Sequence, residues 1–190
     1  MMEKIRRLDN RILEYIQKRI RCPFLDKVMP KITLLGNGGL IWLVVTAVFL
    51  ARKTERPYGF MLMVALVLCL AVGNIALKPL IGRIRPCNNN TDVELLISRP
   101  HDYSAPSCHT LSSFAAATVI CFANVPLGIA ALVLAALIGF SRLYLFVHYP
   151  SDVASGFLLG IALGFFAVFV FYEFLAFLGS WFSVLSLIHI

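Results

Sequence analysis

Five apolar runs, each close to the length needed to cross a membrane, set the strongest limit on how this chain folds. They cover residues 32–51, 58–77, 107–123, 127–147 and 153–178. A helix needs ~20 apolar residues to cross ~30 Å of hydrocarbon. Because backbone groups have no water partner there, each run should be helical. The sequence therefore predicts an all-α, polytopic transmembrane bundle of five to six membrane helices. Residues 179–190 form an interfacial tail or continue the last helix.

The composition excludes an ordinary soluble domain. The 190 residues are 59% hydrophobic and 14% charged, whereas soluble domains are about half apolar and about a quarter charged. One domain is the default at this length. We expect a basic N-terminal segment over residues 1–31 and one transmembrane domain over residues 32–190.

The N-terminal segment is the most basic part of the chain. Residues 1–31 hold nine of the seventeen Lys and Arg residues, against four acids. Apolar side chains recur there at every fourth position, from Leu8 to Ile20, which is typical of an amphipathic helix lying in the membrane interface. Such a helix suits anionic lipid headgroups better than nucleic acid. A solvated terminus is the alternative.

Three short polar blocks interrupt the apolar sequence. They are KPLIGRIRP at residues 78–86, PSCH at 106–109 and SRLYLFVHYPSD at 141–152. The first follows the second run, the second opens the third run, and the third lies between the last two runs. Because consecutive spans run antiparallel, all three blocks should meet at one face of the membrane.

Two of these blocks contain a proline where a helix should begin. Proline suits the first position of a helix, so Pro106 predicts free N–H groups at Ser107, Cys108 and His109, which together with the helix dipole can bind an anion. Pro150 repeats the pattern beside His148 and Asp152. A carboxylate four residues from an imidazole can fix its tautomer and stabilise its charged form.

Cations complete the pattern. Arg142 lies inside an apolar run, where a charged side chain is costly and usually functional. Lys78 and Arg85 come from another span end, and Arg83 is explained by snorkelling to the interface. Cations, helix N–H groups and two histidines together suit a phosphate group, with one histidine attacking phosphorus and the other protonating the leaving oxygen.

No metal or other cofactor is predicted. The acids of the loop before Pro106, which are Asp92, Glu94 and Asp102, lack a metal-ligand pattern. The cations of the three blocks can balance the phosphate charge instead. We interpret His101 as a loop residue and expect no role for His189.

The three blocks resemble the signature of the type 2 phosphatidic acid phosphatase (PAP2) superfamily, which reads K-x6-RP, PSGH and SR-x5-H-x3-D. Lys78 with Arg85-Pro86 matches the first block, and Ser141, Arg142, His148 and Asp152 match the third, each with its full spacing. The matched region is about 40% of the chain, and the N-terminal layout also resembles small bacterial members of the superfamily. The expected domain at 32–190 is therefore a PAP2-like phosphatase domain.

The resemblance implies a role for each matched residue. His148 would be the nucleophile that forms a phosphohistidine, and Asp152 would orient it. His109 would be the general acid and later help to activate water. The phosphate would be bound by five residues, namely Lys78, Arg85, Ser107, Cys108 and Arg142. The family uses no metal.

Cys108 departs from the signature, which has glycine there. If position 108 is helical, cysteine fits; if a positive φ is required, activity should fall. A disulfide between Cys87 and Cys108 is possible but cannot be read from the sequence.

The predicted substrate is a lipid phosphate, since the chain has little room for a soluble-substrate domain. Phosphatidic acid, phosphatidylglycerol phosphate and undecaprenyl pyrophosphate are the candidates, with lipid A phosphate less favoured. A phosphotransferase and a non-catalytic lipid-phosphate binder or transporter are the alternatives. Glycines at 156, 160 and 164 favour helix packing within one subunit over a dimer contact, and the oligomeric state stays open.

We expect an integral protein of the bacterial inner membrane with its site facing outward. Arg52, Lys53 and Arg56 lie in the loop opposite the site, and positive loops favour the cytoplasm. The basic segment at 1–31 argues the other way, because it shares the face of the site.

Overall fold

The computed structural model describes the backbone of residues 2–90 and 93–188 and the side chains of residues 3–90 and 93–178. The structure is 81% helix, and the described residues contain no strand. The helical segments follow one another in this order: α1 (Met2–Tyr15), η1 (Ile16–Ile20), α2 (Pro23–Leu35), η2 (Asn37–Gly39), α3 (Leu40–Ala51), α4 (Arg56–Cys69), η3 (Leu70–Leu77), α5 (Lys78–Ile81), α6 (Pro86–Asn89), α7 (Cys108–Ala123), α8 (Val125–Tyr144) and α9 (Pro150–Ile188).

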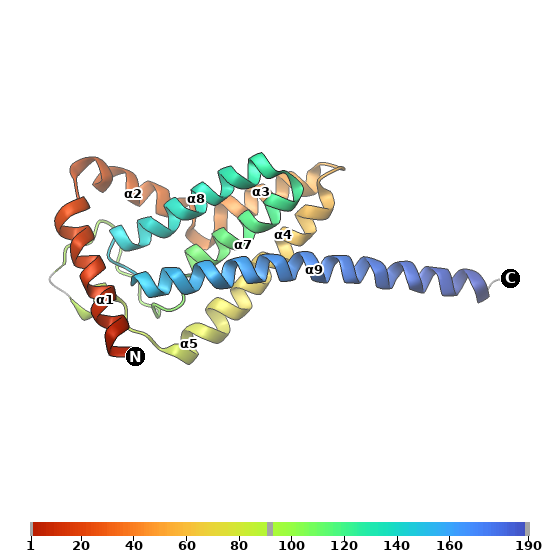
Figure 1. Ribbon diagram of the computed structural model, residues 1–190. Helices are drawn as coiled ribbons and strands as arrows, with labels where there is room; N and C mark the ends of the chain where they lie inside the picture. The colour runs from red at the N-terminus through yellow and green to blue at the C-terminus, as the bar shows by residue number, and fades with distance from the viewer. Residues whose placement is uncertain (1, 91–92, 189–190) are drawn as a thin grey trace.

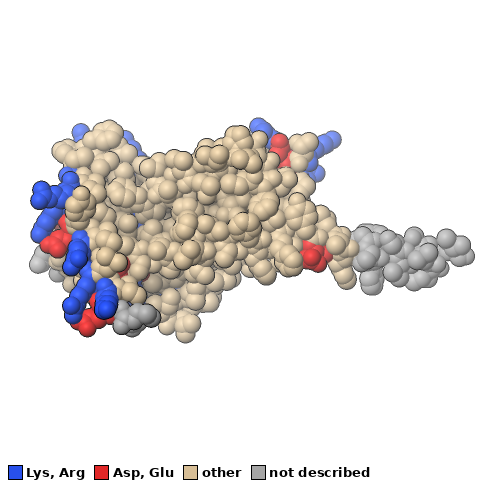
Figure 2. Space-filling view, viewed as in Figure 1, with Lys and Arg blue, Asp and Glu red and all other residues tan. Residues whose placement is uncertain are grey.

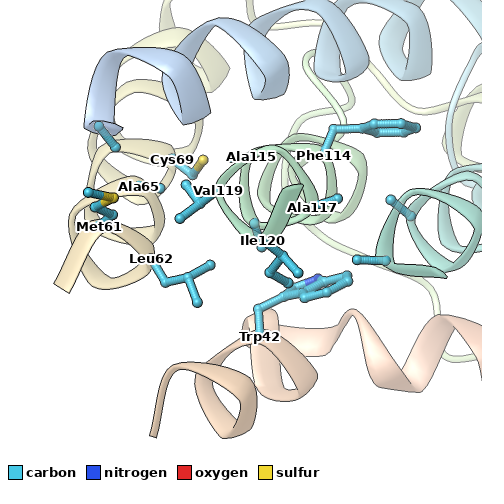
Figure 3. Close-up of a cluster of buried hydrophobic side chains, with 14 of the residues drawn as sticks. Trp42, Met61, Leu62, Ala65, Cys69, Phe114, Ala115, Ala117, Val119 and Ile120 are labelled. Carbon is cyan, nitrogen blue, oxygen red and sulfur yellow. The ribbon is translucent and has the colours of Figure 1, made fainter. Parts of the chain in front are cut away.

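Helix α7 is the centre of the bundle, and α3, α4, α8 and α9 pack around it (Figure 1). Its small and branched side chains, including Ala115, Ala117 and Val119, are fully buried. Figure 3 shows Ile120 of the same helix between Trp42 of α3 and Leu62 of α4. The buried indole N–H of Trp42 is satisfied, because it donates to the hydroxyl of Ser113 at 2.9 Å.

A stripe of glycines brings α9 against α7. A Cβ atom added at Gly160 would lie 2.5 Å from the carbonyl oxygen of Leu111, and one at Gly156 would lie 2.6 Å from that of Ser107. Only a residue without a side chain allows backbones to approach this closely. The prediction that the stripe packs within one subunit is therefore confirmed, and it fixes the start of α9 beside the start of α7.

The structure supports three or four of the five to six predicted membrane helices, and the higher number stays a prediction. Among the described residues, three stretches are long and apolar enough to span, namely Arg56–Asn89, Val125–Tyr144 and Pro150–Leu178. The first predicted run is broken, because Pro23–Leu35 and Asn37–Ala51 meet at a 46° bend and count at most as one further span. The bend falls at Gly38 and Gly39, which both have positive φ. Helix α7 is a shorter apolar helix of 16 residues.

Charged side chains gather toward the two ends of the face that Figure 2 shows, and the surface between them carries almost no Lys, Arg, Asp or Glu. Helix α1 lies at one end beside the start of α9, and α9 extends beyond the other helices toward the C-terminus (Figure 1). The helix continues through residues 179–188, as one of the two predictions for this segment states.

Helix α1 does not bury its predicted apolar stripe as a unit. Ile16 is buried, whereas Leu8 is 56% exposed. The residues of α1 that face the bundle are Asp9 and Leu13, at 2% and 1% exposure. A buried aspartate on this helix was not expected from the sequence.

Candidate active site

The three polar blocks converge at the end of the bundle where α8 ends and α7 and α9 begin. Lys78 opens α5, Arg85 immediately precedes α6, and Arg142 lies in the last turn of α8. Ser107 caps α7, His148 lies between α8 and α9, and Asp152 lies in the first turn of α9. All six of these residues are at most 9% exposed. Charged groups are buried this deeply only when they are paired or functional.

His148 lies between a cation and a carboxylate. Nη1 of Arg85 is 2.8 Å from Nε2 of His148, and Nδ1 of His148 is 3.7 Å from Oδ2 of Asp152. A guanidinium only donates hydrogen bonds, so Nε2 is the acceptor and the ring proton is on Nδ1, on the side of Asp152. Burial, with the charges of Arg85, Arg142 and Lys78, lowers the pKa of His148 well below its usual value. The ring is therefore neutral at physiological pH.

The predicted hydrogen bond from His148 to Asp152 is not formed at 3.7 Å. Among the described residues, Nδ1 of His148 has no hydrogen-bond partner. The carboxylate instead accepts from the hydroxyl of Ser104 at 2.5 Å, the backbone N–H of Tyr149 at 2.9 Å and Arg83 at 2.6 Å. Asp152 is thus held in place from three sides, with one oxygen on the side of the imidazole.

The two cations of the first polar block, Lys78 and Arg85, are already paired with a carboxylate of the protein. Asp102 pairs with Lys78, and its other oxygen accepts from Nη2 of Arg85 at 2.8 Å. Burial alone would raise the pKa of Asp102, but the hydrogen bond from Lys78 and the charge of Arg85 lower it to about 2. The two cations therefore hold an anion in the structure. Sequence reasoning treated Asp102 only as an acid without a metal pattern.

Arg142 keeps part of its hydrogen-bonding capacity unused. Nη1 donates to the hydroxyl of Thr33 at 2.5 Å, while its buried Nε has no partner among the described residues. An unsatisfied buried donor costs about 1–3 kcal/mol, more when it is charged. Such a group is the expected feature of a site that is completed by a ligand.

The start of α7 differs in two details from the prediction: Pro106 lies before the helix, which begins at Cys108 after the N-cap Ser107, and only two of the three N–H groups are free of a backbone partner. The N–H of Ser107 donates to the backbone oxygen of Asp152 at 3.0 Å. It therefore ties α7 to α9 and is not available to an anion. Cys108 and His109 occupy the first turn, where helix N–H groups have no acceptor within the helix.

Cys108 is helical, so the glycine of the family signature is not needed for a positive φ. Phe146 is the one non-glycine residue with positive φ among the described residues. The thiol packs over Gly73, where an added Cβ would be 3.3 Å from Sγ. Cys87 and Cys108 are both free thiols, and no disulfide joins them.

His109 contacts the bend after α2. Its Nε2 lies 2.8 Å from Oδ1 of Asn37. A Cβ added at Gly36 would lie 2.8 Å from Cδ2 of the same ring, so the glycine leaves room for the imidazole. The sequence pattern Gly36 to Gly39 had indicated only a loosened span, and its contact with His109 was missed.

A cavity of about 1420 Å³ joins these groups to the lipid-facing helices. Its polar end is formed by Lys78, Arg85, Asp102, Cys108, His109 and Arg142. Its apolar wall comes from α3 and α4, through residues such as Leu43, Leu50, Met63 and Val67. The same cavity is therefore lined by cationic side chains in one part and by apolar side chains in another.

The remaining predicted residues lie outside this cluster. His101 and Glu94 are exposed loop residues. Asp92 and His189 lie outside the described residues. No group of three or more His, Cys, Asp or Glu side chains placed to hold a metal occurs in the part of the chain that the structure describes.

Two further residues of the site were missed by sequence reasoning. Arg83, assigned to snorkelling, is half-buried and pairs with both Asp152 and Asp9. Ser104 donates to Asp152 from the loop before α7. Arg83 lies two residues before Arg85 on a non-helical segment. Side chains two residues apart on an extended segment point to the same side, and this spacing could have indicated that Arg83 is near the site.

Comparison with known proteins places this site in a family. Residues 56–176 match the model of the PAP2 superfamily. An undecaprenyl-diphosphatase of Sulfolobus acidocaldarius is 35% identical over 129 residues, which cover 67% of this chain and 62% of that protein. A lipid A 4'-phosphatase of Bacteroides thetaiotaomicron is 30% identical over 174 residues, covering 84% and 75%. The chain thus spans about three fifths to three quarters of the length of these relatives.

The fold also matches a solved structure. The PAP2-type phosphatidylglycerolphosphate phosphatase of Bacillus subtilis superposes with a TM-score of 0.73 at 27% identity. The match covers 90% of this chain and 87% of that one.

Proposed function

Because this chain belongs to the PAP2 superfamily, we propose that it is a metal-independent membrane phosphatase that hydrolyses a lipid phosphate monoester or pyrophosphate through a phosphohistidine. One observation carries the proposal. Nε2 of His148 lies 2.8 Å from Arg85, and Arg85 with Lys78 already holds an anionic group, the carboxylate of Asp102. A phosphate in place of that carboxylate would lie beside the nucleophilic nitrogen.

In the first step, the lone pair of Nε2 on His148 attacks phosphorus and the bond from phosphorus to the lipid oxygen breaks. The leaving oxygen takes its proton from His109, which enters this step as the doubly protonated imidazolium and acts as general acid. The phosphorylated imidazole keeps its proton on Nδ1 and is positively charged. Asp152, 3.7 Å from Nδ1 in the resting site, stabilises that charge.

In the second step, the now neutral His109 accepts a proton from water, whose oxygen attacks phosphorus. The bond from phosphorus to nitrogen breaks, and its electron pair returns to Nε2. Inorganic phosphate and the lipid alcohol, or a lipid monophosphate, are the products. Each histidine ends in its starting state.

The equatorial oxygens of the phosphate would be bound by cations and N–H groups. Lys78, Arg85 and the unpaired Nε of Arg142 supply charge at the cavity end. The backbone of Cys108 adds a donor at the start of α7, and Ser107 ties that start to α9. Positioning and charge stabilisation supply most of the catalysis in phosphoryl transfer, so this arrangement would need no metal.

The apolar wall of the cavity favours a lipid substrate. The tail would lie against α3 and α4 while the headgroup reaches the cations. Undecaprenyl diphosphate, lipid A phosphate and phosphatidylglycerol phosphate, on which the relatives act by name, and phosphatidic acid are the candidates.

The chain is an integral membrane protein, and we place it in a bacterial inner membrane with five to six membrane helices, α1 in the interface and the site facing outward. Arg52, Lys53 and Arg56 support this orientation, because they lie where α3 ends and α4 begins, away from the site. Labelling of His101→Cys from each side, an exposed position in the loop before α7, in a variant lacking the five native cysteines, tests the orientation; labelling from the cytoplasm alone would reverse it.

Phosphate release from a panel of lipid phosphates in liposomes tests the function. We expect activity that survives EDTA and is inhibited by vanadate, which binds as a phosphate analogue. Strict dependence on a divalent metal, or no release from any lipid phosphate, would refute the proposal. Transfer to a second lipid alcohol would reveal a phosphotransferase, and binding without turnover a lipid-phosphate binder.

A further inference from the structure

Helix α1 carries a buried carboxylate into the neighbourhood of the site. Asp9 is 2% exposed and accepts three hydrogen bonds from distant parts of the chain. Nη2 of Arg83 donates at 2.7 Å, the backbone N–H of Ser151 at 2.9 Å and the hydroxyl of Ser151 at 2.6 Å. A single charged side chain of α1 therefore contacts both the segment after α5 and the start of α9.

The guanidinium of Arg83 is shared between two carboxylates. Its Nη2 serves Asp9, while its Nη1 donates to Oδ1 of Asp152 at 2.6 Å and to the hydroxyl of Ser151 at 2.7 Å. It also lies over the ring of Tyr149, with 4.0 Å between the guanidinium carbon and the ring centre. Arg83 thus connects the N-terminal helix to the carboxylate beside His148.

Asp9 also caps α9 from another helix. Ser151 lies in the first turn of α9, where N–H groups have no acceptor within the helix. A negative charge at that end is favourable because of the helix dipole. Asp152 is the next residue after Ser151. The carboxylate of Asp9, which holds the N–H and hydroxyl of Ser151, therefore also fixes the position of the backbone of Asp152.

We infer that Asp9 is a positioning residue for the reaction, acting on His148 through Arg83, Ser151 and Asp152. With Asp9 present, Arg83 is balanced between two carboxylates and leaves Oδ2 of Asp152 on the side of Nδ1 of His148. Without it, the guanidinium has Asp152 as its only carboxylate, and α9 loses a cap one residue away. The inference rests on the proposed function, because it concerns the orientation of the proposed nucleophile.

The first test separates orientation from substrate binding. Asp9→Asn keeps the shape and an acceptor oxygen but removes the charge. We expect kcat for lipid phosphate hydrolysis to fall about 10-fold, as is typical when an orienting partner is lost, with KM within about 2-fold of wild type. Lys78, Arg85 and Arg142 do not contact Asp9, so vanadate inhibition should also stay within about 2-fold. The matched control is Glu14→Gln, an exposed acid on the same helix paired with Lys18, and it should leave both constants unchanged.

The second test asks whether the effect passes through Arg83. In an Arg83→Gln background, Asp9→Asn should lower kcat by less than about 2-fold further, because the shared guanidinium is gone. With Arg83 present, Asp9→Glu keeps the negative charge that Asp9→Asn removes, so its kcat should be close to that of the wild type. Ser151→Ala removes a single hydroxyl and should lower kcat about 3-fold at unchanged KM, so it decides the question if Asp9→Asn does not fold.

The outcomes are distinct. Unchanged kcat in Asp9→Asn and Ser151→Ala, or fully additive losses in the double variant, would overturn the inference. A rise in KM together with loss of thermal stability would assign Asp9 a structural role only and would overturn it as well. An inactive wild-type enzyme in the lipid panel would instead refute the proposed function itself.

Discussion

Nη1 of Arg85 lies 2.8 Å from Nε2 of His148, so a phosphate-binding cation and the proposed nucleophile are in direct contact. The guanidinium also donates to the carbonyl oxygen of Val147 at 2.8 Å, which fixes it to the residue before His148. Because Arg85 can only donate, it keeps the ring proton on Nδ1 and the lone pair on Nε2, directed at the guanidinium. A phosphate bound by Arg85 would therefore meet the reactive nitrogen without a change of tautomer.

Replacing the nucleophile should abolish turnover. His148→Ala is expected to lower the rate of phosphate release at least about 10³-fold, since residues that act as a catalytic unit lose nearly all activity together. The exposed loop histidine supplies the control, and His101→Ala should stay within about 2-fold of wild type. Release of radioactive phosphate from a lipid phosphate measures both; equal rates in wild type and His148→Ala would exclude the phosphohistidine.

Removing the internal carboxylate should strengthen anion binding. Asp102 pairs with Lys78 and Arg85, so a substrate phosphate must displace it. A ligand that binds only the displaced form has its apparent affinity reduced by the population of that form. Asp102→Asn should therefore lower the inhibition constant of vanadate by about 10-fold. The matched change Glu94→Gln, in the same loop, should have no effect, and weaker vanadate inhibition in Asp102→Asn would assign the carboxylate a supporting role.

The acid side of the pH profile should report His148. Burial lowers its pKa below the usual value near 6.5, so the ring stays neutral until the pH falls below that value. We expect kcat/KM to be flat across pH 6.5 and to fall only in more acidic solution. The same sign applies to stability, because the unfolded chain binds the proton first and the fold is weakened as pH drops below about 6.5. A decline in kcat/KM centred above pH 7 would contradict this assignment.

Cys108→Gly should keep or raise activity. The residue is helical and its backbone N–H does not depend on the side chain, so glycine supplies the same donor. The cost is a looser helix start, about 1 kcal/mol at most, together with the lost contact of the thiol over Gly73. Thermal unfolding and phosphate release measured on the same preparation check both parts. Loss of hydrolysis in this variant would show that the thiol itself takes part.

A larger side chain in place of a glycine of the α9 stripe should destabilise the bundle. A Cβ at Gly160 would lie 2.5 Å from a backbone oxygen of α7, which cannot move aside as a flexible side chain could. Gly160→Val should therefore cost about 1–3 kcal/mol of unfolding free energy or more. Ala162→Val, an exposed position on α9, is the control and should change the melting temperature little. Equal melting temperatures would mean that α7 and α9 separate easily.

The meeting of Lys78, Arg85, Arg142 and His148 could be predicted because the apolar runs between them fix which helix ends share a face. Antiparallel connectivity needs no side-chain detail. The break in the first run was less accessible, since Gly36 to Gly39 indicated a weak point but not a 46° bend that brings Asn37 to His109.

Contacts made by loops and by the first helix could not be predicted in the same way. Asp102 reaches the cations from a loop whose path depends on packing rather than on periodicity. Asp9 lies 142 residues before Ser151, and nothing local to α1 indicates that its acid would be buried. Arg83 looked like an ordinary interfacial cation because both of its carboxylate partners come from other elements.

The shortness of α7 bears on the depth in the membrane at which we expect the proposed reaction to take place. At 1.5 Å per residue its 16 residues extend about 24 Å, some 6 Å less than the hydrocarbon layer. Its far end joins α8 through the exposed, polar Asn124, which belongs at the headgroup level. With Asn124 at that level, we expect the shortfall to fall at Cys108 and His109, below the surrounding headgroups. The headgroup of a lipid phosphate would then reach the site by moving slightly inward, while its tail stays in the bilayer. The dephosphorylated lipid would already lie within the bilayer when the bond to phosphorus breaks.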